Sequence, residues 1–291
     1  MLAIFGNSGF IGQHLTKMLD DLNIKWIGYD LKDGQDIRNK YQLDDFFEKN
    51  QVTEIIHLAA LAGVRRSKKY PKDYIDTNIL GTQNIVDLAN EYEVKRIVFY
   101  SSSSVYGNVK ELPVKEGVTK MNPISFYGIT KLAGEQIVNN FEGESFIVRP
   151  FTVYGENGRK DEVVFRWLEQ IKNNLPITVY DLESFRGYVY VKDLVEATIK
   201  LLQFNSDEDL IIKENFNLGG SEIVYLKDIL KVFKEFFPDV KISYQDRQKE
   251  DVFAQYACID KAKNILGFDP QPNFIENLKK ILYEETKSIS K

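Results

Sequence analysis

Apolar residues in the first half of the chain fall into short runs separated by longer amphipathic stretches. The runs are rich in β-branched and aromatic residues, and they predict strands at 2–5, 24–30, 54–59, 96–100 and 145–148. The stretches between them predict helices at 10–20, 41–49, 72–91 and 126–140. Strands that alternate with helices indicate a parallel sheet with right-handed crossovers and helices on both faces.

The alternation loosens after Arg149, where loops such as "GENGRKDE" and "YDLESFRG" appear. The later stretch "YVYVKDLVEATIKLLQF" (188–204) predicts a strand followed by a helix. No internal repeat or low-complexity tract is present. We predict a larger lobe from residues 1–150, with return segments near 185–205 and 214–220, and a smaller lobe from 151–180 and 221–291.

Composition excludes several classes of protein. A net charge of −5 provides no basic excess to neutralise nucleic-acid phosphates. No apolar run approaches the ~18 residues of a membrane span, and the apolar N-terminus is too short for a signal sequence. The lone Cys258 cannot form an internal disulfide, and His14 and His57 are the only histidines, so we expect no metal site. We therefore expect a cytoplasmic protein that binds neither membrane nor nucleic acid.

A glycine-rich segment, "IFGNSGFIGQHL", joins the first predicted strand to the first predicted helix. Gly6 permits a tight turn, Gly9 lets the backbone approach a pyrophosphate, and Gly12 lets helix and strand pack closely. This spacing alone also occurs in ordinary glycine-rich turns, but here a strand precedes it and a helix follows it. The segment, with Phe10 and Ile11, therefore predicts a dinucleotide site in a Rossmann-type doubly wound α/β sheet.

A carboxylate at the end of the second predicted strand indicates which dinucleotide is bound. Asp30 closes "WIGYD", where a carboxylate accepts hydrogen bonds from the adenosine ribose and repels a 2′-phosphate. Asp30 could instead be a surface residue opening a turn, and the nearby Lys32 weakens the discrimination against NADP. We predict NAD as the cofactor.

Hydroxyl groups mark the end of the fourth predicted strand, which runs directly into Ser101–Ser104. Ligands bind at the carboxyl edge of open parallel sheets. Downstream, Asn122 and Pro123 predict a helix start, and Tyr127 and Lys131 are spaced to share one helix face. A neighbouring ammonium favours the phenolate, lowering a tyrosine pKa from ~10 toward the range of a useful base. The constellation predicts hydride transfer at a carbinol carbon, although a Y-x-x-x-K pair alone is also common on solvated helices.

The chain resembles the extended short-chain dehydrogenases/reductases, specifically the NAD-dependent nucleotide-sugar epimerase/dehydratase family. The resemblance covers almost the whole chain. It is carried by "GNSGFIG", "HLAALAGV", "DTNILGTQNI", "SSSSVYG", "YGITK", "RPFTVYG", "RGYVYVKDLVEA" and "FNLGG". It implies that the smaller mixed α/β lobe binds the substrate.

The resemblance also implies individual roles. Tyr127 matches the catalytic base, Lys131 its partner and Ser102 the catalytic hydroxyl, with Ser103 as a substrate contact. The further cofactor contacts implied are Asp36 and Ile37 at the adenine, Ala59 and Ala60 at the nicotinamide ribose, Pro150 and Phe151 at the nicotinamide, and Leu58 and Ser101.

Other positions narrow the reaction. Family dehydratases carry an acidic pair after the catalytic hydroxyl, where this chain has Ser103 and Ser104, which favours epimerisation or simple redox. The stretches "AGVRRS" and "FTVYGENGRKD" are similar to UDP-glucuronate 4-epimerases, in which Thr152 and Arg159 would contact the sugar carboxylate. The alternative for Arg159 is an exposed loop charge.

Two arginines match the family's nucleotide-end contacts less closely. Arg186 lies in "RGY" where the family has "RDF" or "RDY". Arg247 lies four residues before Asp251, with Glu250 where an "R-x-G-D" pattern has glycine. The nucleotide and the sugar therefore stay open.

We predict an NAD-dependent epimerase that inverts C4 of a UDP-sugar through a 4-keto intermediate, with UDP-glucuronate as the first candidate. The alternatives are a UDP-glucose or UDP-N-acetylglucosamine 4-epimerase, a nucleotide-sugar reductase or dehydrogenase, and a non-catalytic dinucleotide-sensing scaffold. Relatives often form homodimers through the helices that here lie near 72–91 and 126–140, so we expect a homodimer.

Overall fold

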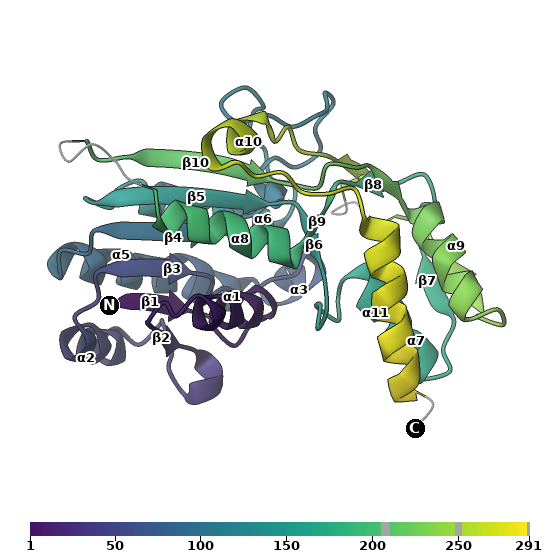
Figure 1. Ribbon diagram of the computed structural model, residues 1–291, viewed down its shortest axis with the longest axis horizontal. Helices are drawn as coiled ribbons and strands as arrows, with labels where there is room; N and C mark the ends of the chain where they lie inside the picture. Colours follow the sequence, from purple (N-terminus) through teal and green to yellow (C-terminus); the bar gives the residue numbers. More distant parts are fainter. Residues whose placement is uncertain (205–209, 248–251, 290–291) are drawn as a thin grey trace.

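A computed structural model describes residues 1–204, 210–247 and 252–289 of the chain. Its main feature is a six-stranded sheet with the order β10-β5-β4-β3-β1-β2, in which every neighbouring pair is parallel (Figure 1). The strands are β1 (Leu2–Phe5), β2 (Trp26–Tyr29), β3 (Glu54–His57), β4 (Arg96–Tyr100), β5 (Glu144–Pro150) and β10 (Lys213–Leu218). After β1 the chain crosses to β2 on one side of β1, and after β2 it crosses to β3 on the other side. The topological switch point of the sheet therefore lies between β1 and β3. The predicted doubly wound α/β fold is confirmed.

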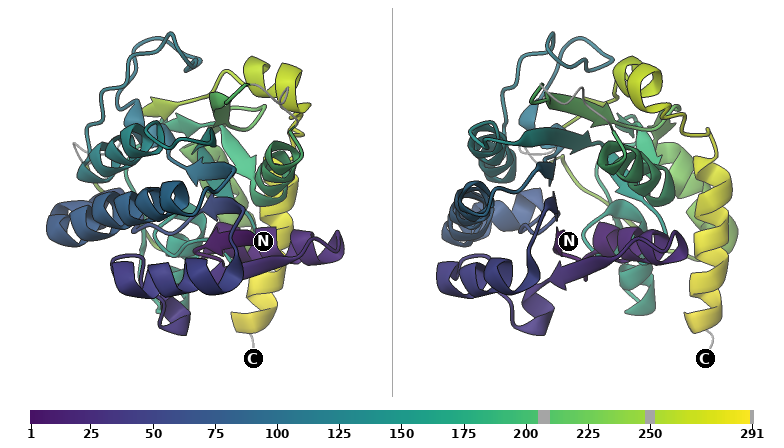
Figure 2. Two further views of the ribbon diagram at one scale, coloured as in Figure 1. Left: turned by 90° about the vertical axis from the view of Figure 1, so that its left-hand side faces the viewer. Right: turned by 60° about the vertical axis from the view of Figure 1, so that its left-hand side comes forward.

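Helices cover both faces of this sheet (Figure 2). Leu2 and Ile4 of β1 face one core, with α1 (Phe10–Asp21) and α8 (Val191–Leu202). The alternate residues Ala3 and Phe5 face a second core, with α2 (Lys40–Asn50), α5 (Gly81–Glu91) and α6 (Phe126–Val138). Successive strand residues point to opposite faces, so a strand covered on both sides is apolar throughout.

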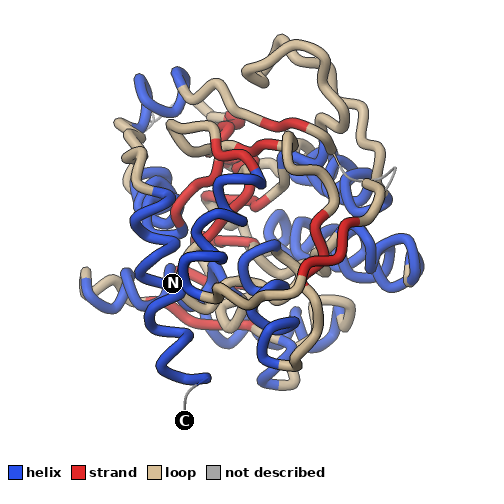
Figure 3. Tube along the Cα trace, turned by 90° about the vertical axis from the view of Figure 1, so that its right-hand side faces the viewer, coloured by secondary structure: helices blue, strands red, loops and turns tan. Residues whose placement is uncertain are grey.

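A third core lies outside the sheet. It joins α7 (Val163–Lys172), α9 (Leu226–Phe236), α11 (Phe274–Ile289) and β7 (Ile177–Val179), which pairs with β12 (Ile242–Tyr244). Trp167, which has no exposed side-chain surface, packs edge-on against Phe233 in this core. The strand arrows of the main sheet point toward these elements, which we call the second lobe (Figure 1). Figure 3 views the molecule from the side of this lobe, with the helix that leads to the C-terminus, α11, in blue.

The helix expected at 72–91 is confirmed, although it is not a regular α-helix throughout. It consists of α4 (Pro71–Tyr74), a π-helical turn η2 (Ile75–Leu80) and α5, which follow one another without a break. Asn78 lies in η2, and its amide group accepts from Leu61 N (2.7 Å) and donates to Leu61 O (3.0 Å). These bonds tie the turn to the loop after β3, a constraint that helical periodicity does not reveal.

The predicted return segment near 185–205 joins the main sheet only through α8. Its strands β8 (Phe185–Arg186) and β9 (Tyr188–Tyr190) pair elsewhere, β8 with β11 (Val224–Tyr225) and β13 (Ala254–Gln255), and β9 with β6 (Thr152–Tyr154). The segment near 214–220 supplies β10 at the sheet edge. No helix among the described residues is long and apolar enough to cross a membrane.

A buried ion pair fastens α6 to the sheet. Arg149 on β5 donates to both carboxylate oxygens of Glu135 on α6, at 2.9 and 2.8 Å, and both side chains are almost fully buried. Arg149 also donates to the Tyr106 hydroxyl at 2.8 Å. Removal of one partner of such a pair leaves the other charge buried without compensation.

We expect Arg149→Met to lower the free energy of unfolding by about 3–5 kcal/mol, because Glu135 would lose its counter-ion in the core. Denaturant unfolding followed by circular dichroism measures this change. Lys263→Met is the control, since it removes an exposed pair with Asp269 and should leave the midpoint unchanged. Equal stability of Arg149→Met and the native chain would contradict the conclusion that the Glu135–Arg149 ion pair fastens α6 to the sheet.

Candidate active site

A cavity of about 820 Å³ lies between the carboxyl ends of the main strands and the second lobe. Among the predicted site residues, the following line it: Gly6, Gly9, Phe10, Ile11, Gly12, Leu58, Ala60, Ser101, Ser102, Ser103, Tyr127, Lys131, Pro150, Phe151, Thr152, Arg159, Arg186 and Arg247. Asp30, Asp36, Ile37 and Ala59 do not. Residues distant in sequence thus meet in one cavity.

The glycine-rich segment forms a tight turn between β1 and α1. Gly6 has φ +90°, which L side chains rarely adopt, and a Cβ on Gly12 would lie 2.3 Å from Gly6 O. Ala59 packs behind the turn, since a Cβ on Gly6 would lie 2.6 Å from Ala59 N. The amino end of α1 therefore opens into the cavity, an arrangement suited to a pyrophosphate.

Asp30 is held in place by backbone groups at the end of β2. Its carboxylate accepts from Ser8 N and from Lys32 N, each at 2.9 Å. The Lys32 ammonium donates to Ser8 O at 2.7 Å, so it lies beside the glycine turn. Asp30 keeps further lone pairs for a ribose, while Lys32 adds a positive charge close by.

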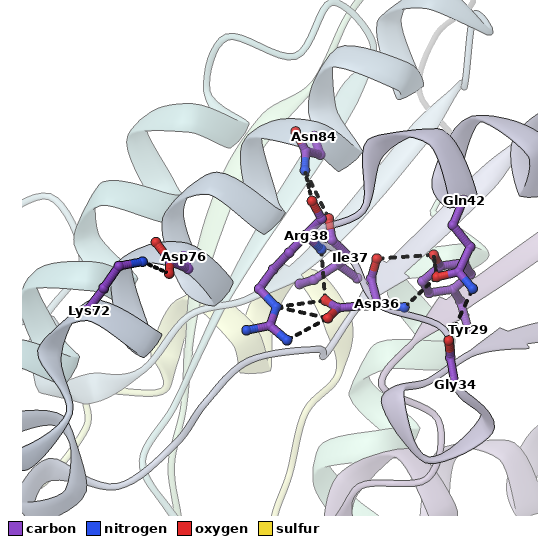
Figure 4. A network of polar contacts seen from close by, with 9 residues as sticks. All are labelled: Tyr29, Gly34, Asp36, Ile37, Arg38, Gln42, Lys72, Asp76 and Asn84. Carbon is purple, nitrogen blue, oxygen red and sulfur yellow. Dashed lines mark hydrogen bonds and ion pairs between the residues drawn. The ribbon is translucent and has the colours of Figure 1, made fainter.

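The segment around Asp36 forms a separate polar network (Figure 4). The Asp36 carboxylate accepts from Arg38 Nε at 2.9 Å and from Arg38 Nη2, and this ion pair lowers the pKa of Asp36. Asn84 on α5 donates to Ile37 O at 3.0 Å. Arg38 thus fixes the orientation of Asp36 before any ligand binds.

The serines after β4 form a short 3-10 turn, η3 (Ser103–Val105), which Ser102 caps. The Ser102 hydroxyl accepts from Ser104 N at 3.1 Å, and it lies near enough to Tyr127 to lower the pKa of the Tyr127 hydroxyl. Glycine at position 128 lets α6 approach the serine turn closely, because a Cβ there would lie 2.6 Å from Ser104 O. The two predicted catalytic hydroxyls therefore lie near each other at the cavity.

The helix that carries Tyr127 begins where the range 126–140 predicts, but not with the cap expected at Asn122 and Pro123. α6 begins at Phe126, and its cap is Ser125, whose hydroxyl accepts from Gly128 N at 3.0 Å. Ser67 accepts from Tyr127 N at 3.0 Å and satisfies a second free amide. Asn122 and Pro123 are not part of the helix, and the Asn122 carbonyl packs against Gly107 instead.

Electrostatics around Tyr127 differ from the prediction. Burial raises the pKa of Tyr127, and the largest opposing effect comes from the Arg159 guanidinium, followed by the Ser102 hydrogen bond. Burial lowers the pKa of Lys131 to about 7, against the opposing charge of Glu135. The sequence predicts that Lys131 lowers the pKa of Tyr127, but in this structure Arg159 is the stronger influence that opposes the rise.

Ser101 faces the protein interior. Its hydroxyl donates to Glu135, whose carboxylate is held by Arg149. Ser101 therefore links the end of β4 to the ion pair that fastens α6.

The substrate-end arginines are already engaged. Arg159 donates from Nε to Asp161 at 2.9 Å and from Nη2 to the same carboxylate, so the guanidinium already has a partner within the chain. Arg186 donates to the carbonyl groups of Phe253 (2.9 Å) and Val252. The guanidinium of Arg247 lies 5.2 Å from the Phe253 ring centre, while the departures at Glu250 and Asp251 lie outside the described residues.

Sequence reasoning missed several residues of the cavity wall. Arg65 and Arg166 lie over the ring of Tyr180, at 4.5 and 5.4 Å from its centre, and all three line the cavity. Arg65 stands in the quoted "AGVRRS", which could have pointed to it. No sequence signal identified Gln255, which also lines the cavity.

Comparison with known proteins identifies the family. The model of the NAD dependent epimerase/dehydratase family matches residues 2–219. A UDP-glucuronate 4-epimerase of Thermodesulfobacterium geofontis is 33% identical over 252 residues, covering 84% of this chain and 76% of that protein.

Solved structures agree over almost the whole chain. MoeE5, in complex with UDP-glucuronic acid and NAD, superposes with a TM-score of 0.89 at 27% identity, over 99% of each chain. A UDP-glucose 4-epimerase of Thermotoga maritima with UDP-glucose superposes with a TM-score of 0.88 at 26% identity, over 100% of this chain and 99% of that chain.

Proposed function

The chain belongs to the NAD-dependent epimerase/dehydratase family, and we propose that it is a UDP-sugar 4-epimerase whose first substrate is UDP-glucuronate. The observation that carries the proposal is that Ser102, Tyr127 and Lys131 line one cavity beside the glycine turn. Relatives named for C4 epimerisation of UDP-sugars support the reaction type.

The residues present fit NAD. The glycine turn has no room for side chains where a pyrophosphate would approach, and Asp30 keeps acceptor capacity for the adenosine ribose. We propose that Phe10, Ile11, Leu58, Ala59 and Ala60, with Ser101, Pro150 and Phe151, complete this site, and that Asp36 and Ile37 contact the adenine. Residues 1–150 would then form the lobe that binds the cofactor. Residues 151–180 and 221–291 would together form the lobe that binds the substrate.

Tyr127 acts as the base in this proposal, removing the proton of the C4 hydroxyl while Ser102 bridges the phenolic and C4 oxygens. NAD supplies the hydride acceptor at C4 and the donor on return. The flat 4-keto sugar turns in the cavity and presents its other face, and Tyr127 returns the proton to the C4 oxygen. Lys131 donates to the cofactor ribose and adds positive charge near Tyr127.

Arg159 supports a carboxylate at C5 of the sugar. Asp161 occupies its Nε and one Nη2 hydrogen, which leaves the Nη1 edge of the guanidinium for a second acceptor. Thr152 lines the same cavity, as do Ser103, Arg186 and Arg247, which we propose to contact the substrate. Asp161 shares the charge of Arg159, so we expect a weaker preference than an unpaired arginine would give.

The Arg159–Asp161 pair also favours a second candidate, a UDP-glucose 4-epimerase. The Asp161 carboxylate already neutralises the Arg159 guanidinium. A neutral hydroxymethyl group at C5 of the sugar would therefore not leave this guanidinium without a counter-ion.

Proton NMR with a panel of UDP-hexoses and UDP-hexuronic acids tests the reaction. We expect C4 inversion without net NADH, and loss of turnover in Tyr127→Phe, because phenylalanine has no hydroxyl to carry the proton. Stoichiometric NADH would indicate a dehydrogenase, and unchanged turnover in Tyr127→Phe would overturn the site. NAD binding with no turnover of any sugar would favour a sensing scaffold.

We expect kcat/KM to be roughly tenfold higher for UDP-glucuronate than for UDP-glucose, the size of one charge-assisted hydrogen bond. Arg159→Ala should remove most of this preference without changing NAD affinity. Lys160→Ala, which alters an exposed charge in the same loop, is the control and should keep the preference. Equal or better turnover of UDP-glucose by the native chain would establish the second candidate instead.

We also propose a homodimer through η2 and α6, which lie in contact. Leu80 and Ile129 on these elements are 52% and 48% exposed, and pairing with a second copy would cover them. Light scattering at micromolar concentration should give a dimer mass for the native chain and a monomer mass for Leu80→Asp/Ile129→Asp. Tyr41→Asp, a substitution at another exposed site, should stay dimeric. A monomeric native chain would contradict this proposal.

A further inference from the structure

Gln255 on β13 makes two hydrogen bonds to the serine turn after β4. Its Nε2 donates to Ser103 O at 2.7 Å, and its Oε1 accepts from the Ser103 hydroxyl at 3.0 Å. Both residues are only 6% exposed, although both line the cavity. The two residues are 152 positions apart in the chain, so this contact joins the main sheet to the second lobe.

The contact acts on the first residue of η3. Ser103 O also accepts from Tyr106 N at 3.1 Å, so both of its lone pairs are used. Ser102 caps this same turn through its bond from Ser104 N, and its hydroxyl lies near enough to Tyr127 to lower the pKa of that residue. The direction of the Ser102 hydroxyl therefore depends on where Ser103 is held.

Gln255 is itself held from the substrate side of the cavity. β13 pairs with β8, with Gln255 opposite Arg186, and Gly187 N donates to Gln255 O at 2.9 Å. The Arg186 guanidinium donates to the carbonyl groups of Val252 and Phe253, which precede β13. A movement of Arg186 would thus be transmitted to Gln255 and on to the serine turn.

We propose that Gln255 is a positioning residue that holds the serine turn so that Ser102 points at Tyr127, and that it links this alignment to Arg186 in the substrate site. The inference rests on the roles proposed above for Ser102 and Tyr127. Gln255 contacts neither reacting atom and acts through Ser103. Ser103 then serves the reaction through its backbone position, because its hydroxyl proton is committed to Gln255.

Gln255→Met tests the proposal, because it keeps the side-chain length and removes both hydrogen bonds. We expect kcat to fall roughly tenfold, as for the loss of a buried hydrogen bond, with KM and NAD affinity within about twofold of the native values. Gln170→Met is the matched control. It removes two similar bonds to Thr178 in the second lobe (2.9 and 3.1 Å), outside the cavity wall, and should leave kcat unchanged.

Gln255→Glu separates positioning from general stability. The protonated carboxyl can both donate to Ser103 O and accept from its hydroxyl, whereas the ionised carboxylate cannot donate. The kcat of Gln255→Glu, divided by the kcat of the native chain at the same pH, should therefore rise as the pH falls through the pKa of the new carboxyl group. Burial raises that pKa, and the cations on the cavity wall lower it, but neither effect changes the sign of the response. The charged and titratable groups on that wall include Arg186, Arg247, Lys131, Glu162, Tyr127 and Tyr188.

The outcomes separate this inference from the proposed function. If Ser102→Ala and Tyr127→Phe abolish turnover while Gln255→Met keeps kcat within about twofold, the inference fails and the function stands. If neither Ser102→Ala nor Tyr127→Phe lowers turnover, the proposed catalytic site is wrong, and the inference about Gln255 is wrong with it. A crystal structure of Gln255→Met needs no activity: a serine turn shifted so that Ser102 moves away from Tyr127, compared with the native chain, supports the inference, and an unmoved turn overturns it.

Discussion

The Glu135–Arg149 ion pair is the constraint on which the active-site geometry depends. Glu135 follows Lys131 by one helical turn and Tyr127 by two, so the position of α6 on the sheet sets the position of both side chains. The same carboxylate accepts from Ser101 at the end of β4, the strand that leads into the serine turn. One buried network therefore fixes the helix that carries the proposed base and the strand that leads to the proposed catalytic hydroxyl. Such a pair contributes little net stability compared with apolar packing, but it defines one relative position of these elements.

The charge balance in the cavity follows from this burial. The pKa of Tyr127 is raised because α6 brings this side chain into the interior, and burial lowers the pKa of Lys131 to about 7 for the same reason. Arg159, in the loop before α7, lines the same cavity and opposes the shift of the Tyr127 pKa. The residue proposed to meet the sugar thereby also acts on the proposed base. In the proposed reaction, substrate recognition and proton transfer share one guanidinium, and Asp161 moderates both.

The sequence predicted the sheet, most of the helices that cover it and much of the cavity wall. These features depend on local patterns: the spacing of apolar residues, the turn residues and the motifs at the ends of strands. It did not predict the π-helical turn at Asn78 or the pairing of β8 with β13, because both depend on contacts between distant segments. The partners of Arg159 and Ser103 were missed for a related reason. Asp161 stands two residues from Arg159, yet nothing in the spacing distinguishes an internal partner from a solvated charge.

Deuterium placed at C4 of the UDP-sugar gives the most direct test of the central claim, which is reversible oxidation and reduction at one carbon within one cavity. The account predicts that the C4 epimer retains its deuterium at C4 after many turnovers in ordinary water, with no reduced cofactor released. Exchange of the label with solvent, or its accumulation in free reduced cofactor, would contradict the account. The first result would place proton abstraction at carbon, and the second would make the chain a dehydrogenase.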